Sequence, residues 1–342
     1  MPRSDAKCDS DGSRLPRSVS QLPITGLNLG SGPTAFEDCA YGWLGRGRGP
    51  ISVVDTMPST ALDAAGLALR ELRRALEQGA DPFDPDRLDV RDPALIEGVM
   101  PLVRAYMRGY LRAQVDGTEN LGEAPVLYVS NHNGGIVGPD LVATLGLLWE
   151  ALGPGEPVYA LAHDFAMRQA RAFGRFIQRF GGIRAARSNA ERVLESGARV
   201  LVYPGGDLDA YRHYRRRNEV VFGDRTGFVL VARKVGVPIV PIVVHGAHRS
   251  AYIFNEGEAI ARLLDMPRWA RLSRFPLALA LPWGIAAGPW VPYFPLPLKL
   301  RLRVLPAIHL GEGEAPEATR ERVREAMQVA LTEMAREAGD LE

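Results

Sequence analysis

The sequence predicts an α/β fold in which a largely parallel central sheet is flanked by helices. From Val115 onward, short apolar runs alternate with longer stretches of helical periodicity, which is the pattern of strands joined by crossover helices. Two polar, glycine-containing motifs each follow directly after one of the apolar runs. Ligands of open α/β sheets bind at the carboxyl ends of the strands, so both motifs are expected at that edge.

The individual elements follow from the spacing of the apolar residues. Short apolar runs predict strands at 125–130, 157–161, 199–203, 238–244 and 299–305. Apolar residues at three- and four-residue steps predict helices at 139–152, 169–179, 188–196, 224–235 and 316–337.

The chain before Val115 has a different organisation. Residues 1–55 are rich in Gly, Ser, Pro and Arg without a sustained period, so we expect them to be disordered or loosely attached. Residues 56–112 are predicted to form a helical N-terminal extension. In this extension leucines recur at helical spacing from Leu62 to Leu76, and Asp92-Pro93 is typical of a helix start. An α/β domain at 113–312 and a C-terminal helix at 313–342 complete the predicted organisation.

Charge and cysteine content narrow the classes of function. The formal net charge of +1 over 342 residues leaves no basic footprint for nucleic acid, which is therefore not an expected partner. The two cysteines, Cys8 and Cys39, are too few for a disulfide framework or a cysteine metal site.

The first motif, Ser130-Asn131-His132-Asn133-Gly134-Gly135, supplies the candidate catalytic base. The pKa of an unperturbed imidazole, about 6.5, allows His132 to accept a proton near neutral pH. Asp140 is the candidate partner that would fix the tautomer of the ring, or alternatively it caps the helix that begins at Leu141. The backbone N–H groups of Gly134 and Gly135 are candidate donors to an oxyanion. The alternative for His132 is a hydrogen-bonded loop histidine without a catalytic role.

Residues 115–250 resemble the glycerolipid (lysophospholipid) acyltransferase superfamily. The resemblance is carried by a lead-in and by four motifs in the family's order. These segments are Val115–Leu121, Asn131-His132 with Asp140, Gly181–Arg187, Tyr203-Pro204-Gly205-Gly206 and Val237–Ile242. The resemblance implies a glycerolipid acyltransferase-like fold and makes residues 113–312 the acyltransferase domain.

The chain departs from the family pattern at two places, the spacing of His132 and Asp140 and the residue after Pro204. The family separates its histidine and aspartate by four residues, whereas seven lie between His132 and Asp140. The third motif of the family has a glutamate after its proline, where this chain has Gly205. The Pro-Gly-Gly form is similar to the branch of diacylglycerol acyltransferases and plant phytyl ester synthases. In that branch an acidic residue follows three places after the second glycine, and Asp209 matches it.

The resemblance implies an O-acyltransferase that moves a fatty acyl group to the hydroxyl of a glycerolipid or another lipid alcohol. His132 would be the general base and Asp140 its orienting partner. Arg187 would bind a phosphate. The acceptor site would be shaped by Pro204, Gly205, Gly206 and Asp209. The donor would be acyl-CoA, or alternatively acyl carrier protein, with no metal and no further cofactor. Lipid substrates imply a peripheral or monotopic protein at the cytoplasmic face of a membrane.

Three alternative functions stay open at this point. The first is an acyltransferase specific for lysophosphatidate, which the phosphate-binding role of Arg187 favours. The second is a metal-dependent hydrolase that combines His132 with His163-Asp164, His245 and His248, because imidazole and carboxylate groups bind zinc or iron. The third is a lipid carrier without catalytic activity.

Two further segments have more than one interpretation. Phe275–Leu298 has no charged residue but contains six prolines, which exclude a spanning helix. It is either a buried crossover against the sheet, or an apolar surface that enters a bilayer or lines an acyl tunnel. The basic cluster Arg212 and Arg215–Arg217 is either a solvated face or a contact for lipid headgroups or CoA phosphates.

Overall fold

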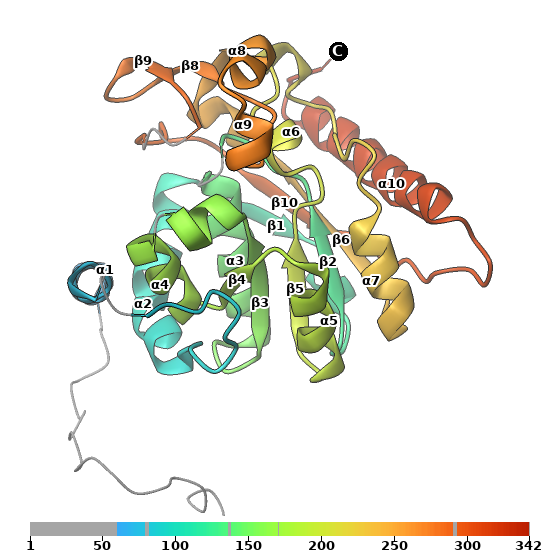
Figure 1. Ribbon diagram of the computed structural model, residues 1–342, viewed down its shortest axis with the longest axis horizontal. Coiled ribbons are helices and arrows are strands. Elements are labelled where there is room, and N and C mark those ends of the chain that lie inside the picture. Colours follow the sequence, from blue (N-terminus) through green and yellow to red (C-terminus); the bar gives the residue numbers. More distant parts are fainter. Residues whose placement is uncertain (1–59, 79–81, 136–137, 170, 290–292, 342) are drawn as a thin grey trace, which may run out of the picture. The chain divides into compact units, whose positions relative to one another are not determined.

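The computed structural model describes residues 60–78, 82–135, 138–169, 171–289 and 293–341 (Figure 1). The prediction for residues 1–55 lies outside these ranges. The predicted domain boundaries at 113, 312 and 313 remain predictions, and the elements within them are described below.

A seven-stranded sheet forms the centre of the domain, in the order β1-β10-β6-β2-β5-β3-β4. All neighbouring strands are parallel except β10 and β6, which are antiparallel. This arrangement confirms the predicted largely parallel sheet. The strands are β1 (Gln114–Asp116), β2 (Leu127–Ser130), β3 (Val158–Ala162), β4 (Gly182–Arg184), β5 (Arg199–Val202), β6 (Ile239–His245) and β10 (Arg301–Val304).

Helices flank the sheet, and the predicted helices form close to their expected positions, whereas α6, α8 and α9 were not predicted. The helices are α1 (Ala61–Glu77), α2 (Pro93–Ala105), α3 (Pro139–Leu152), α4 (Arg171–Arg179), α5 (Arg187–Glu195), α6 (Gly206–Ala210), α7 (Gly227–Val235), α8 (Glu258–Leu263), α9 (Met266–Trp269) and α10 (Pro316–Glu337). Short turns of 3-10 or π helix occur at Tyr106–Tyr110, Thr118–Leu121, Phe165–Gln169, Tyr214–Arg216 and Ala247–Ser250.

The sheet separates two hydrophobic cores, because successive side chains of a strand point to opposite faces. In β2, Tyr128 belongs to the core that includes α2 and α3, whereas Leu127 and Val129 belong to the core that includes α5, α7 and α10. In β6, Val240 and Val243 divide between the two cores in the same way. Strands buried on both faces have no polar alternation, which is why they appear as continuous apolar runs in the sequence.

Helix α1 forms as predicted, but three of the leucines that predicted it are exposed. Leu62, Leu69 and Leu76 are 85%, 66% and 62% exposed, whereas Ala64 and Ala75 are buried. The helix packs against α2 and α4, and its half-buried Leu67 and Ala68 contact the core that includes α2 and α3. Its leucine spacing therefore reports helical structure but not the face that is buried.

A second, three-stranded antiparallel sheet was not expected from the sequence. It consists of β7 (Tyr252–Asn255), β8 (Leu277–Ala280) and β9 (Gly284–Ala287) in that order. Figure 1 shows β8 and β9 with α8 and α9 beyond one end of the strands of the central sheet. The interpretation of Phe275–Leu298 as a buried crossover is wrong, because a tight turn at Pro282-Trp283 makes it a hairpin with exposed apolar residues. No described helix is long and apolar enough to cross a membrane.

Candidate active site

A cavity of about 740 Å³ lies at the carboxyl ends of four parallel strands. The lining residues that follow these strands are His132 after β2, His163 after β3, Ala185 after β4 and Tyr203 after β5. The volume falls within the range of roughly 300–1,000 Å³ that is typical of small-molecule sites. The two sequence motifs therefore meet at one cavity, as their positions after strands predicted.

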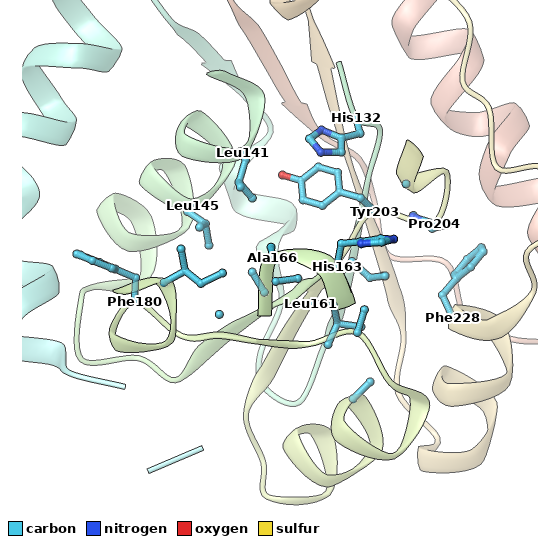
Figure 2. A pocket seen from close by; sticks show the side chains of 18 of the residues that line it. His132, Leu141, Leu145, Leu161, His163, Ala166, Phe180, Tyr203, Pro204 and Phe228 are labelled. Atoms are coloured by element: carbon cyan, nitrogen blue, oxygen red, sulfur yellow. The ribbon is translucent and has the colours of Figure 1, made fainter. Parts of the chain in front are cut away.

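Most of the cavity wall is apolar. Figure 2 shows His132 and Tyr203 close together, with Leu145 and Phe180 on one side and Phe228 on the other. Apolar side chains reach the cavity from four helices on the side of α2 and α3. They include Ala68 of α1, Val99 and Leu102 of α2, Leu141 and Trp149 of α3, and Phe173 and Ile177 of α4. Such a wall suits an alkyl chain, whose transfer from water is favourable in proportion to its buried area.

The polar part of the lining lies near α5 and α7. Arg187, Asp207, Asp224, Arg225 and Thr226 all contribute to it. The cavity therefore combines an apolar branch with a charged region that is suited to a polar group. His132 belongs to the same lining.

His132 and Asp140 form a buried hydrogen-bonded pair. The distance between His132 Nδ1 and Asp140 Oδ2 is 2.6 Å, and the same oxygen accepts a hydrogen bond from the amide of Asn133 at 3.0 Å. Asp140 is fully buried and His132 is 7% exposed. A carboxylate that holds Nδ1 fixes the imidazole tautomer and stabilises the imidazolium that would form at Nε2.

The longer spacing between His132 and Asp140 is accommodated by the start of α3. Asp140 is the second residue of this helix, and Gly138 occupies the N-cap without a side-chain cap. A Cβ atom on Gly138 would lie 2.3 Å from Asp140 Oδ1 and 2.6 Å from the Asn133 carbonyl oxygen. The carboxylate can therefore turn back toward the ring only because residue 138 has no side chain. In the structure Asp140 contacts His132 and does not cap α3.

The backbone of His132 is held by a buried ion pair between Asp209 and Arg212. Asp209 accepts a hydrogen bond from the His132 amide at 2.5 Å, and Arg212 donates to the His132 carbonyl at 2.9 Å. The two side chains also contact each other at 2.6 Å. Burial raises the pKa of the Asp209 carboxyl, whereas Arg212 and the amides of His132 and Val221 oppose that rise.

Asn131 joins the loop to the central sheet. Its side chain donates to the Val244 carbonyl at 2.9 Å and accepts from the Val244 amide at 2.8 Å. The amide group thus continues the pairing between β2 and β6 beyond the end of β2. Together with the Asp209–Arg212 pair, this contact anchors the residues on both sides of His132.

The predicted acceptor-site residues fall into two groups. Pro204, Gly206 and Arg187 line the cavity. Gly205 lies outside the lining, and Asp209 is 1% exposed behind His132. The prediction that Asp209 shapes the acceptor site directly is therefore corrected, since its carboxylate is occupied by Arg212 and by two backbone amides.

The two glycines predicted to bind an oxyanion are placed differently from that expectation. Neither Gly134 nor Gly135 lines the cavity. The Gly135 amide donates to the Ala210 carbonyl at 3.1 Å, so it is not directed at a reacting group. The Gly134 carbonyl accepts a hydrogen bond from the Tyr293 hydroxyl. A positive φ at both residues explains why glycine stands there, because other residues rarely adopt it.

Sequence reasoning missed several polar residues of the cavity. Arg225 donates to the Pro204 and Gly205 carbonyls at 3.1 and 2.7 Å and to Asp207 Oδ1 at 2.6 Å. Asp207 also accepts from the Ser273 amide at 2.5 Å. The only local signal was the position of Asp207 directly after the Pro-Gly-Gly motif.

The histidines of the metallohydrolase alternative lie in separate places. His163 lines the cavity, donates through Nε2 to the Arg271 carbonyl at 3.2 Å, and has its pKa lowered by burial. His245 Nε2 lies 2.9 Å from Asp340 Oδ2, and His248 packs against the ring of Tyr214. In the described ranges no group of three or more His, Cys, Asp or Glu side chains is arranged to hold a metal ion.

Comparisons with known proteins agree with the class of site that this geometry describes. Residues 112–245 match the family model of the acyltransferases. An uncharacterised protein of Mycobacterium tuberculosis is 28% identical over 205 residues, which are 60% of this chain and 54% of that protein. Phytyl ester synthase 2 of Arabidopsis thaliana chloroplasts is 28% identical over 158 residues, which are 44% of this chain and 22% of that enzyme.

A solved structure is also similar. The crystal structure of the 1-acyl-sn-glycerophosphate acyltransferase PlsC from Thermotoga maritima matches with a TM-score of 0.45 and 16% identity, over 80% of this chain and 94% of that chain. The chain spans about half the length of its mycobacterial relatives. The family match identifies residues 112–245 as an acyltransferase domain.

The buried ion pair beneath His132 leads to a prediction about stability. We expect Arg212→Met to lower the free energy of unfolding by about 3–5 kcal/mol, because it leaves the buried Asp209 carboxylate without its partner. Urea denaturation measures this loss. Arg215→Met, which changes an exposed arginine three residues away, should cost no more than about 0.5 kcal/mol. Equal effects of the two substitutions would contradict the role of the pair.

A second prediction concerns the pH dependence of stability. Burial and nearby positive charges lower the pKa of His248 to about 2. The unfolded chain therefore binds a proton at His248 below about pH 6.5 that the folded chain does not bind. Stability from this group is complete above that pH, and its loss as the pH falls should approach about 1.4 kcal/mol per pH unit.

Urea denaturation between about pH 7 and pH 4 measures that slope, since His248 should be protonated only in the unfolded chain over this range. His248→Gln should make the slope shallower than in the unsubstituted protein. His309→Gln, at an exposed position, serves as the control and should leave it unchanged. Parallel slopes for all three proteins would show that His248 titrates normally in the folded state.

Proposed function

We propose that this protein is an O-acyltransferase that moves a fatty acyl group from acyl-CoA to the hydroxyl of a glycerolipid or another lipid alcohol. The observation that carries the proposal is the His132–Asp140 pair in the lining of a largely apolar cavity. The pair lies within the segment that matches the acyltransferase family.

The reaction follows from the chemistry of a thioester and an alcohol. His132 Nε2 accepts the hydroxyl proton of the acceptor while the hydroxyl oxygen attacks the thioester carbonyl carbon. A carbon–oxygen bond forms, and a tetrahedral intermediate results. The carbon–sulfur bond then breaks, and the CoA thiolate receives the proton from the imidazolium. Asp140 holds Nδ1 throughout and stabilises the positive ring between the two steps. No covalent intermediate with the protein is required.

The shape of the cavity supports a fatty acyl donor. Its apolar branch between α2, α3 and α4 is lined by aliphatic and aromatic side chains that can bury an alkyl chain. The polar region near Arg187 and Arg225 can accept the CoA part of the donor or a phosphate of the acceptor. Acyl carrier protein is the alternative donor. The reaction as proposed uses neither a metal nor a further cofactor.

A second candidate is an acyltransferase specific for lysophosphatidate. The position of Arg187 in the cavity lining favours it, because a guanidinium binds phosphate oxygens through charge-assisted hydrogen bonds. The Pro-Gly-Gly motif supports a neutral alcohol instead. For both candidates the acceptor is a membrane lipid, so we propose a peripheral protein at the cytoplasmic face of a membrane.

The general-base role is tested by a product scan. Purified protein is incubated with palmitoyl-CoA and a panel of glycerol 3-phosphate, lysophosphatidate, monoacylglycerol, diacylglycerol and a fatty alcohol, and acylated products are identified by mass spectrometry. We expect His132→Ala to lower the rate on the preferred acceptor by roughly 10²-fold or more, since this is the contribution of a positioned base.

The controls separate the alternative functions. His309→Ala, at an exposed position, should retain full activity. A parallel series with palmitoyl acyl carrier protein tests the second donor. If His132→Ala kept more than a few per cent of the rate, His132 would not be the base. Release of free palmitate without acylated product would support a hydrolase, whereas lipid binding without turnover by either protein would support a carrier.

The choice of acceptor is tested at Arg187. We expect Arg187→Gln to raise the KM for lysophosphatidate by about tenfold or more, because hydrogen bonds to charged groups contribute about 1.5–3 kcal/mol. The KM for diacylglycerol should stay the same, since it carries no phosphate. Arg171→Gln, at an exposed position outside the cavity lining, is the control. An unchanged KM for lysophosphatidate would make Arg187 a surface charge without a role in binding.

A further inference from the structure

We propose that the outer face of the three-stranded sheet β7–β8–β9 docks onto a bilayer that contains anionic lipids. This docking surface is defined by Tyr252, Leu279, Leu281, Trp283 and Ile285. The inference deepens the proposed function, on which it rests, because it names the part of the protein that would meet the membrane holding the acceptor.

The docking surface is apolar where a sheet of this kind is normally polar. Tyr252 pairs with Leu279 across β7 and β8, and Leu279 pairs with Ile285 across β8 and β9. These three residues are 43%, 50% and 68% exposed. Ala278 and Ala286, on the opposite face, are each 8% exposed and pack toward the protein. An antiparallel sheet with one solvated face usually carries polar residues there.

The exposed apolar residues of the protein are concentrated in this region. Eleven of the 17 large apolar side chains that are exposed in the described residues lie between Tyr252 and Leu296. The tip of the hairpin carries Trp283 at 55% exposure, and Phe294 on the returning chain is 70% exposed. Clusters of this kind mark protein or membrane interaction sites.

Charge at the edge of the docking surface favours an anionic bilayer over a neutral partner. Between Glu256 and Leu298 the chain has four arginines and three acidic residues, Glu256, Glu258 and Asp265. Arg271 forms an ion pair with Asp164 at 2.5 Å, whereas the Arg268 side chain is 86% exposed and lies 3.8 Å from Asp265. Nearby Trp269 is 51% exposed. Arginines and tryptophans beside an apolar surface match the composition of the membrane interface, where anionic headgroups attract the basic side chains.

The segment that leads into the docking surface also borders the cavity. The Arg271 carbonyl accepts a hydrogen bond from His163, and the Ser273 amide donates to Asp207. Both His163 and Asp207 line the cavity. A protein docked through the β7–β9 sheet would therefore hold this side of its cavity close to the headgroup layer. A lipid hydroxyl would then reach the site without leaving the interface completely.

The proposal is tested by sedimentation with vesicles of phosphatidylcholine and of an equal mixture of phosphatidylcholine and phosphatidylglycerol. We expect the double variant Leu279→Ser/Ile285→Ser to bind mixed vesicles about tenfold or more weakly than the unsubstituted protein, since each substitution removes a large apolar side chain. Arg268→Gln should weaken binding to mixed vesicles by about fivefold, with little change for pure phosphatidylcholine. Binding is measured without turnover, so it is independent of the acyltransferase assignment.

Two control variants test whether the loss of vesicle binding is specific to the docking surface. Val329→Ser changes a side chain on α10 that is 55% exposed, and Leu62→Ser changes the exposed stripe of α1. Both should bind vesicles as the unsubstituted protein does. In detergent solution the double variant should keep its rate on the preferred acceptor, whereas on vesicles the rate should fall with binding. Unchanged vesicle binding of the double variant would overturn the proposal. So would loss of binding only in Leu62→Ser, or a lipid-free dimer that the double variant dissociates.

Discussion

The buried ion pair between Asp209 and Arg212 is the interaction on which the candidate site depends. Both side chains lie out of water, so each requires the other and the surrounding backbone groups. Asp209 binds the amide of His132 and Arg212 binds its carbonyl. The position of the imidazole is thereby tied to two residues of the chain that follows the Pro-Gly-Gly motif. The motif and the histidine act as one structural unit although about seventy residues separate them.

The central sheet explains why these parts meet. Parallel strands bring the segments after β2, β3, β4 and β5 to the same edge, where the cavity lies. Helices packed on the two faces then determine the character of the walls. The helices next to the first core contribute apolar side chains, and the start of α5 contributes Arg187. One cavity thus combines the His132–Asp140 pair, an apolar wall and a charged region, as the proposed acyl transfer requires.

The small β7–β9 sheet lies next to the candidate site and is joined to it by hydrogen bonds. Tyr211 donates to the Pro289 carbonyl at 2.7 Å, and Tyr293 contacts both Ser250 and the Gly134 carbonyl. The hairpin is therefore bonded to the loop that carries His132. Its inner face packs against the domain while its outer face stays apolar. The proposed docking surface and the loop that carries His132 are therefore neighbouring parts of the fold.

The sequence by itself determined the elements whose signals are local. Buried parallel strands appear as apolar runs and helices as three- and four-residue spacings, so the α/β class and the helices were predictable. The position of both motifs at the same edge of the sheet was predictable as well. The three-residue strands β1 and β4 were not predictable, because three residues are too few to show a period. His132 was predicted as a site residue because Asn131 and two glycines lie beside it, and Asp140 was predicted as its partner.

Tertiary structure alone decided which side chains are buried and what they contact. Arg212 and Arg215 belong to one basic run in the sequence, yet Arg212 lies beneath His132 and Arg215 lies in solvent. Asp209 matched a family position for the acceptor site but pairs with Arg212 instead. Leu62 and Leu69 of α1 and Leu279 and Ile285 of the hairpin are apolar in the sequence and yet exposed in the structure. Burial and pairing depend on contacts between distant segments, and a one-dimensional pattern contains no information about which segments those are.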